Sequence, residues 1–284
     1  MSSRGGGVSG AGAGGPGVRG RVRAVLDPFL ALRRSGLLWL VSIAALVALT
    51  VAFWPAFEGA SGITEALEQL PGSLVDAFGL AELGTPAGFL QGNLYDLIVP
   101  LLIGGATIGF ANGLTAADED AGRLELVLAQ PVTRQSVFAA RTMAVLGWLI
   151  VLTVGTAAVQ VASDRIIGLD IADARVVETA VLCGLLGAFH GGLALLIAGL
   201  RPRSGLVLGV TLAILIAGFV VTALFPLADQ LRGLVHISPW DWAFGGDPLR
   251  SPTEPWRYLA LGVPALAFAV LGAVAFSRRD VAVG

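Results

Sequence analysis

DEDAGRLELVLAQPVTR, residues 118–134, is the stretch that decides how this chain folds. It mixes charged and apolar residues, and long uncharged stretches lie on both sides of it. The chain of 284 residues is 55% hydrophobic and only 13% charged, whereas soluble domains carry about 25% charged residues. This composition indicates a membrane protein in which residues 118–134 join two spans.

Six uncharged stretches are long enough to cross a bilayer as helices, each of which needs about 20 apolar residues. Open sheets leave backbone groups unpaired in lipid, and the stretches lack the alternation of barrel strands, so helices are predicted. The predicted fold is an all-α membrane protein. Its predicted spans are 35–57, 94–117, 142–163, 179–200, 204–228 and 258–277.

The distribution of arginine predicts that both termini lie in the cytoplasm. All 18 basic residues are arginine, and this topology places 13 of them inside and five outside. The inner set is Arg4, Arg19, Arg21, Arg23, Arg33, Arg34, Arg123, Arg134, Arg141, Arg201, Arg203, Arg278 and Arg279. The outer set is Arg165, Arg175, Arg232, Arg250 and Arg257. Together with its Ala, Gly, Val and Leu richness, the absence of lysine suggests a GC-rich bacterial genome, and therefore a bacterial plasma membrane.

The charged stretch carries the signals of a short amphipathic helix between the second and third spans. Asp118, Glu119 and Asp120 have the charge that a helix N-terminus favours. Glu119 and Arg123 are four residues apart and are predicted to pair on one helical face.

The sequence also predicts the apolar face of this helix and the position of its end. Leu124, Val127 and Leu128 follow the spacing of one helical face. Pro131 is predicted to end the helix, because the residue before proline avoids helical geometry. Thr133 is predicted to cap the next helix. A helix that merely rests on the membrane surface is the alternative.

The chain lacks the residues that several other functions need. Without lysine it has no standard phosphate-binding loop, so energy from ATP must come through another polypeptide. A net charge of −2 gives no basic surface for nucleic acid. The single cysteine, Cys183, excludes an intrachain disulfide and a site with several cysteine ligands.

The stretch 118–134 resembles the signature region of ABC-2 type transporter permeases. In that family an acidic stretch, Gly-x-Leu-Glu-Leu and a Pro-Val-(Ser/Thr)-Arg tail follow the second span. The resemblance covers about residues 24–280, but only 118–134 is sharp. The matching positions are Glu119, Asp120, Gly122, Leu124, Glu125, Leu126, Pro131, Val132, Thr133 and Arg134.

This resemblance implies the permease subunit of an ATP-binding cassette exporter, with a coupling helix that docks in a cleft of a separate ATPase subunit. The ATPase would bind ATP and Mg; this chain would bind no cofactor or metal and would not itself be an enzyme. The other implied partners are the lipid bilayer and a second permease chain, identical or homologous. The expected coupling residues are Glu119, Asp120, Gly122, Arg123, Leu124, Glu125, Leu128, Pro131 and Arg134, with a minor contact from Arg201 and Arg203.

Small and ionisable residues inside the spans give two further predictions. Gly105, Gly109 and Gly113 fall on one helical face, where small residues let helices approach closely, so an interhelix seam is predicted. His190 is an ionisable residue inside the fourth span, which raises a functional hypothesis. A neutral histidine that hydrogen-bonds to a neighbouring helix is the favoured interpretation.

The flanks and loops carry weaker signals. Residues 1–23 are predicted to be a disordered tail, 24–280 one permease domain and 281–284 a C-terminal tail. Residues 24–34 are either an interfacial amphipathic piece or an extension of the first span. Two short interfacial helices, with a disordered loop as the alternative, are predicted in 58–95 before a turn at Thr85-Pro86. An aromatic belt, or the lining of an exit mouth, is predicted for Trp240, Trp242 and Trp256.

The predicted cargo is hydrophobic or amphipathic, such as a drug, an antibiotic or a lipid, because the spans are almost free of charge. An ion-coupled secondary carrier is the alternative, although it would need acidic or basic residues in mid-membrane. An intramembrane enzyme is less favoured, because His190 alone supplies no convergent catalytic group.

Overall fold

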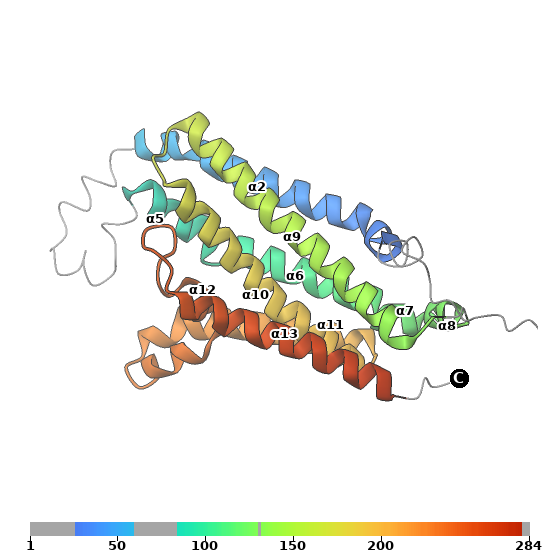
Figure 1. Cartoon of the computed structure of the whole chain (residues 1–284). Helices are drawn as coiled ribbons and strands as arrows, with labels where there is room; N and C mark the ends of the chain where they lie inside the picture. Colours follow the sequence, from blue (N-terminus) through green and yellow to red (C-terminus); the bar gives the residue numbers. More distant parts are fainter. Residues whose placement is uncertain (1–25, 60–83, 130–131, 280–284) are drawn as a thin grey trace, which may run out of the picture.

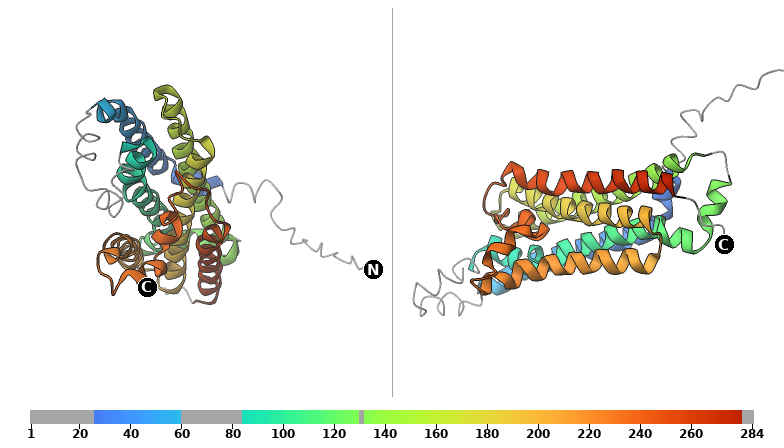
Figure 2. Two further views of the ribbon diagram at one scale, coloured as in Figure 1. Left: turned by 90° about the vertical axis from the view of Figure 1, so that its left-hand side faces the viewer. Right: turned by 90° about the horizontal axis from the view of Figure 1, so that it is seen from below.

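The computed structural model describes residues 26–59, 84–129 and 132–279, and within these ranges the chain forms helices and turns but no strand. Six of the described helices are long and apolar enough to cross a membrane. They run side by side as one elongated bundle (Figure 1), and views from other directions show the same arrangement (Figure 2). The prediction of an all-α protein with six spans is confirmed.

The spans begin and end close to the charged residues that bound the uncharged stretches. The π-helix is named η2, and η3 and η4 are 3₁₀ helices. In chain order the elements are α2 (Arg33–Gly59), α5 (Pro86–Leu90), η2 (Gln91–Tyr95), α6 (Ile98–Leu114), α7 (Ala116–Asp120), α8 (Arg123–Leu128), α9 (Arg134–Ile167), α10 (Asp173–Leu200), α11 (Ser204–Leu224), η3 (Phe225–Leu227), η4 (Arg232–Ile237), α12 (Pro239–Phe244) and α13 (Pro255–Arg278).

The bundle has two distinct ends, named here after the short helices found at each. At the α8 end lie the starts of α2, α9 and α11 and the last residues of α7, α10 and α13 (Figure 1). The α12 end carries α5, η3, η4 and α12. Because the chain crosses the bundle six times, the first residues of α2 and the last residues of α13 both lie at the α8 end.

The second span starts earlier than predicted. The turn expected at Thr85-Pro86 is instead the start of α5: the Thr85 hydroxyl accepts a hydrogen bond from the Gly88 backbone at 3.1 Å, and Pro86 occupies the first helical turn. Proline is well suited to that position, because the first backbone N–H groups of a helix have no intrahelical partner. The helical path from Pro86 to Asp120 then includes the π-helical segment η2.

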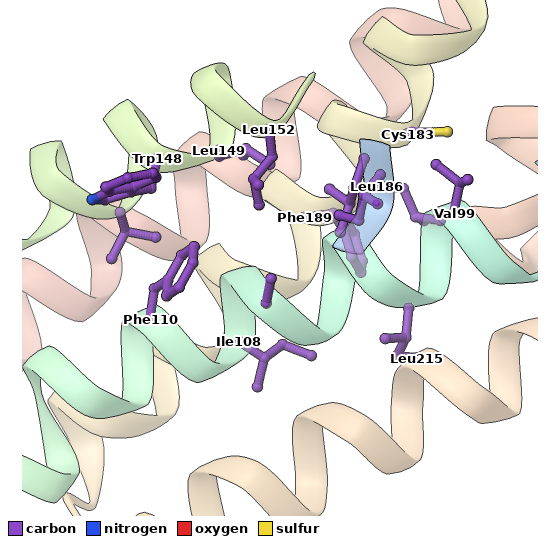
Figure 3. Packing of buried hydrophobic residues seen from close by; sticks show 14 of the residues in the cluster. Val99, Ile108, Phe110, Trp148, Leu149, Leu152, Cys183, Leu186, Phe189 and Leu215 are labelled. Carbon is purple, nitrogen blue, oxygen red and sulfur yellow. The ribbon is translucent and has the colours of Figure 1, made fainter. Parts of the chain in front are cut away.

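α10 is the central helix of the bundle, because small residues allow its neighbours to approach closely. A Cβ atom built on Gly192 would lie 2.6 Å from the backbone oxygen of Ala265 in α13, and one built on Gly272 would lie 2.7 Å from that of Leu195 in α10. Larger side chains from α6, α9 and α10, among them Phe110 and Trp148, fill the adjacent core (Figure 3).

The N-terminal piece is a separate helical turn and not a simple extension of the first span. Residues 26–31 are helical, a turn follows at Leu32, and α2 begins at Arg33. Phe29 stacks on Trp148 of α9 with ring centroids 4.9 Å apart, and the Trp148 indole donates to the Phe29 carbonyl at 2.9 Å. These contacts hold the piece against α9 at the α8 end.

The predicted glycine seam is not formed within the described part of the chain. No heavy atom outside the local backbone lies within 4 Å of a Cβ atom built on Gly105, Gly109 or Gly113. That face of α6 therefore has no partner within the described part of the chain. The glycine that meets a neighbouring span is Gly104, whose Cβ would lie 3.0 Å from the Leu215 side chain of α11.

The predicted aromatic belt is wrong for one of its three members. Trp240 is 1% exposed, and its indole N–H donates to the Leu215 carbonyl at 2.8 Å, so it is a core residue between α12 and α11. Ser238 caps α12 immediately before it. Trp242 is half-buried and Trp256 is exposed. The predicted interfacial helices before Thr85, the two tails and Pro131 lie outside the described residues.

Candidate functional site

The charged stretch folds as two short helices and not as the single helix that its sequence predicts. α7 continues the second span to Asp120, residues 121–122 form a turn, and α8 runs from Arg123 to Leu128 beyond the ends of the spans (Figures 1 and 2). The acids therefore lie in α7 and precede α8. The structure does not describe how residues 130–131 connect α8 to α9.

Gly122 causes the break between the two helices. Its φ angle is +69°, in the left-handed region that side chains with a Cβ atom disfavour. The Gly122 backbone N–H still bonds to the Glu119 carbonyl at 2.9 Å, which closes α7. Because glycine reverses the chain here, α8 leaves the axis of the second span.

Asp118 is the centre of the first ion-pair group. One carboxylate oxygen lies 2.7 Å from the Arg123 guanidinium, and the other lies 2.8 Å from that of Arg141 in α9. Arg141 is only 6% exposed, so this pair fixes α7 against the wall of the bundle. The prediction that Arg123 pairs with Glu119 is wrong, because the Gly122 turn brings Arg123 back to Asp118.

Glu119 reaches the C-terminal end of the last span. Its carboxylate lies 2.6 Å from the guanidinium of Arg279, the residue after α13, and both side chains are 19% exposed. The Arg279 carbonyl accepts a hydrogen bond from the Arg134 guanidinium at 2.5 Å. Residues 160 positions apart in sequence thus meet at the α8 end.

Asp120 reaches the start of the fifth span. Its carboxylate accepts a hydrogen bond from the Ser204 backbone N–H at 2.9 Å, at the first residue of α11. Negative charge is favourable at a helix N-terminus. Asn112 of α6 donates to the Ser204 hydroxyl at 2.8 Å. Arg201 and Arg203 flank this contact and remain exposed.

α8 presents a mixed polar and apolar face outward. Leu124 is 1% exposed and anchors the helix, and Val127 is half-buried. Glu125 is exposed, and Leu126 is 72% exposed. Leu124 thus faces the bundle, and Glu125 and Leu126 lie on the exposed side of α8.

The expected coupling residues therefore divide into two groups. The inward group holds α7 and α9 to the bundle and includes Glu119, Asp120 and Arg134. Arg123 and Glu125 belong to the outward group on α8. Thr133 caps α9 as predicted, accepting from the Ser136 backbone N–H at 3.2 Å. Local sequence patterns do not reveal the partner residues Asn112, Arg141, Ser204 and Arg279, because their roles depend on contacts between distant segments.

Two cavities lie near these elements. One, an open cavity of about 350 Å³, lies between residues 27–31, Val127 of α8 and the start of α9, and Asp118 and Arg141 line part of it. The other, of about 310 Å³, lies among α6, α9, α10 and α13 and is lined almost entirely by apolar residues. Leu149 of α9 lines the second cavity and is labelled in Figure 3.

The rim of the apolar cavity faces sideways out of the bundle. Met143 is 52% exposed and Leu266 is 68% exposed on the two helices that flank the opening, α9 and α13. The Thr142 hydroxyl lines the cavity, is buried and has no hydrogen-bond partner among the described residues. The cavity thus offers mostly apolar walls, and of its two threonines only Thr107 has a hydrogen-bond partner among the described residues.

His190 does not belong to either group. It is fully buried in α10, and its Nδ1 atom bonds to the Leu186 carbonyl of the same helix at 2.8 Å. Its Nε2 atom has no hydrogen-bond partner among the described residues, so the predicted hydrogen bond to a neighbouring helix is not found there. In the described residues, no three histidine, cysteine or acidic side chains gather as metal ligands.

Comparison with known proteins gives one family match. The model of the family described as "Multidrug efflux system permease Rv1217c, C-terminal domain" matches residues 28–277, which include all six spans and the α7–α8 segment. A search of curated proteins finds no match.

Proposed function

The chain belongs to the family of the multidrug efflux system permease Rv1217c, C-terminal domain, and from this premise we propose that it is the membrane subunit of an ABC-2 type exporter. With six apolar helices it is a multi-pass permease of an efflux system. In the proposal, separate ATPase subunits bind ATP and Mg and dock on α8. The expelled cargo is a hydrophobic or amphipathic molecule.

The outward face of α8 is the observation that carries the proposal. Glu125 and Leu126 are exposed on a helix fixed to the bundle through Leu124 and α7. Such a helix transmits force well, because its inner side is anchored and its outer side is free. Closure of the docked ATPases would displace α8. This displacement shifts the bundle toward one conformation because the closed ATPases bind that conformation more tightly than the other.

Arginine placement supports a cytoplasmic position for the α8 end. The described arginines at this end are Arg33, Arg34, Arg123, Arg134, Arg141, Arg201, Arg203, Arg278 and Arg279. Those at the α12 end are Arg165, Arg175, Arg232, Arg250 and Arg257. We therefore place both termini in the cytoplasm and the protein in a bacterial plasma membrane.

A second permease chain is part of the proposal. The face of α6 with Gly105, Gly109 and Gly113 has no partner within the described residues. Faces of this kind allow close helix packing in membranes. Pairing of two chains would place two α8 helices beside two ATPase subunits.

The apolar cavity supports the proposed cargo class. Its volume of about 310 Å³ is within the range of small-molecule sites, and its opening between Met143 and Leu266 faces sideways, as entry from the bilayer requires. The unpaired Thr142 hydroxyl would orient a cargo with one polar group.

Site-specific photocrosslinking in native membranes tests the docking. A photoreactive residue replaces Leu126 on α8 or, as the matched control, Leu234 at the α12 end, which is 45% exposed. We expect position 126, and not 234, to crosslink to a protein whose sequence contains a phosphate-binding loop. The proposal fails if position 126 yields no such ATPase, or if both positions yield it equally.

One observation favours an ion-coupled secondary carrier as the second candidate. Asp164 in α9 is 5% exposed, and neither carboxylate oxygen has a hydrogen-bond partner among the described residues. Gln160 lies one turn earlier and accepts a hydrogen bond from the Tyr95 hydroxyl of η2. Buried acids of this kind take part in ion coupling in carriers.

A further inference from the structure

The acids Asp118, Glu119 and Asp120 each bind a different span: α9, α13 and α11 respectively. α7 is only five residues long and follows α6 directly, so one short helix is tied to four spans. A segment with these ties cannot shift without changing at least one of the contacts.

We propose that Glu119 and Arg279 are positioning residues that carry a displacement of α8 to α13. This inference rests on the proposed function, in which the ATPase displaces α8. It assigns Glu119 to a contact inside the chain and not to the ATPase surface. Asp118 and Asp120 connect α7 to α9 and α11 in the same way.

The contacts of Arg279 suit such a linkage. Its guanidinium lies 2.6 Å from the Glu119 carboxylate and 5.6 Å from the Phe276 ring centroid. Its carbonyl accepts from Arg134 at 2.5 Å. The ion pair is mostly shielded from water, and shielding strengthens the attraction between charges. Arg278, one residue earlier, is exposed and makes no ion pair with any residue that the structure describes.

α13 in turn passes its motion to α10. At Gly192, Gly199 and Gly272 the backbones of the two helices meet without room for a Cβ atom. Closely packed helices move together, because interiors at this density resist deformation. A pull on Arg279 therefore acts on the α10–α13 pair, which also forms two walls of the apolar cavity.

The structure leaves space for α8 to move. The cavity of about 350 Å³ separates Val127 of α8 from Val137 and Ala140 of α9. α8 is therefore attached mainly through Leu124 and α7, and a push from outside acts on the α7 contacts first.

The first experiment measures the linkage in the isolated chain, without any ATPase. Spin labels at Ala129→Cys, directly after α8, and Val274→Cys on α13, in a Cys183→Ala background, report the distance between the end of α8 and α13 in lipid nanodiscs. We expect Glu119→Arg and Arg279→Glu each to broaden the distance distribution, and the double variant Glu119→Arg/Arg279→Glu to narrow it again. Arg278→Glu, the matched control, is expected to leave it unchanged.

The second experiment measures ATP-driven dye transport by the same variants in inverted membrane vesicles. We expect each single reversal to lower the rate about tenfold and the double reversal to restore it within about twofold, as expected for a directly coupled pair. Glu119→Gln serves as the milder variant if a reversal lowers the amount of folded protein.

The outcomes separate the linkage from the proposed function. If the single reversals broaden the distances and the double variant does not restore them, or if Arg278→Glu broadens them equally, the linkage is wrong. It is also wrong if the single reversals broaden the distances and the double variant restores them, but all of these variants transport dye with ATP at the wild-type rate. If ATP drives no transport by the wild type while the distances behave as expected, the linkage stands as a structural contact and the proposed function fails.

Discussion

At the scale of single residues, Gly122 decides the geometry of the candidate site. A glycine in the left-handed region allows the chain to leave the second span and form α8 at an angle. The same turn brings Arg123 to Asp118. The sequence motif showed a glycine in this place but not its conformation, so a continuous helix was predicted.

Replacing Gly122 tests this turn. We expect Gly122→Ala to lower the free energy of unfolding by about 1 kcal/mol, because a Cβ atom is strained in the left-handed region. Gly122→Asn is expected to cost less, since asparagine tolerates that region better. Gly233→Ala is the matched control: Gly233 has an ordinary φ and open space around it. Denaturant unfolding in micelles measures all three, and an equal effect of Gly122→Ala and Gly233→Ala would refute the role of the turn.

Arg141 gives a second prediction at this scale. Arg141→Met removes the buried one of the two arginine partners of Asp118 and leaves only the exposed Arg123, and we expect a loss of about 3 kcal/mol in the free energy of unfolding. The double variant Asp118→Asn/Arg141→Met is expected to recover much of the loss, because the only charge left without its partner, Arg123, is exposed to solvent. Chemical denaturation of the purified protein compares the two. A double variant as unstable as Arg141→Met would show that the charge pair is not the cause.

At the scale of elements, the spans were predictable and the short helices were not. An uncharged apolar stretch of about 20 residues crosses a bilayer as a helix, because its backbone groups must pair with one another in lipid. The six spans therefore followed from the positions of the charged residues. Helix caps such as Thr133 were also predictable, because a cap bonds to a backbone group only three residues along the chain. The η2 segment and the α7–α8 break depend on packing and on one backbone angle, which sequence patterns do not reveal.

The apolar cavity yields a prediction for α13. Ala269 lines the cavity, whereas Ala267 on the same helix is exposed on the outside of the bundle. We expect Ala269→Phe to fill the cavity and to weaken binding of a lipophilic dye at least tenfold, and Ala267→Phe to leave it unchanged. Fluorescence titration of the purified protein measures the dye affinity. Equal affinities for the two variants would exclude the cavity as the cargo site.

At the scale of the whole molecule, the topology is open to direct test. We expect a membrane-impermeant maleimide to label Asp229→Cys, at the α12 end, on intact cells. Ala129→Cys, directly after α8, is expected to react only after permeabilisation. The native Cys183 is fully buried and does not compete for the reagent. Labelling of Ala129→Cys on intact cells would reverse the proposed orientation.

The candidate site shows why long-range contacts escape sequence reasoning. The motif predicted that residues 118–134 matter, but it assigned Glu119, Asp120 and Arg134 to one outward surface. The structure turns them toward α13 and α11, and their partners Arg279 and Ser204 lie far along the chain. Only a fold that brings six spans together defines such partners, and local sequence patterns do not reveal them.

The measurement that tests the central claim most directly is dye accumulation in inverted membrane vesicles, with ATP and with a proton-conducting uncoupler. The account predicts that ATP drives accumulation of a lipophilic fluorescent dye by the wild type and that the uncoupler leaves it unchanged. It also predicts that Glu125→Arg on the exposed face of α8 abolishes accumulation while insertion stays normal. Accumulation driven by a proton gradient without ATP, or unchanged in Glu125→Arg, would contradict the account.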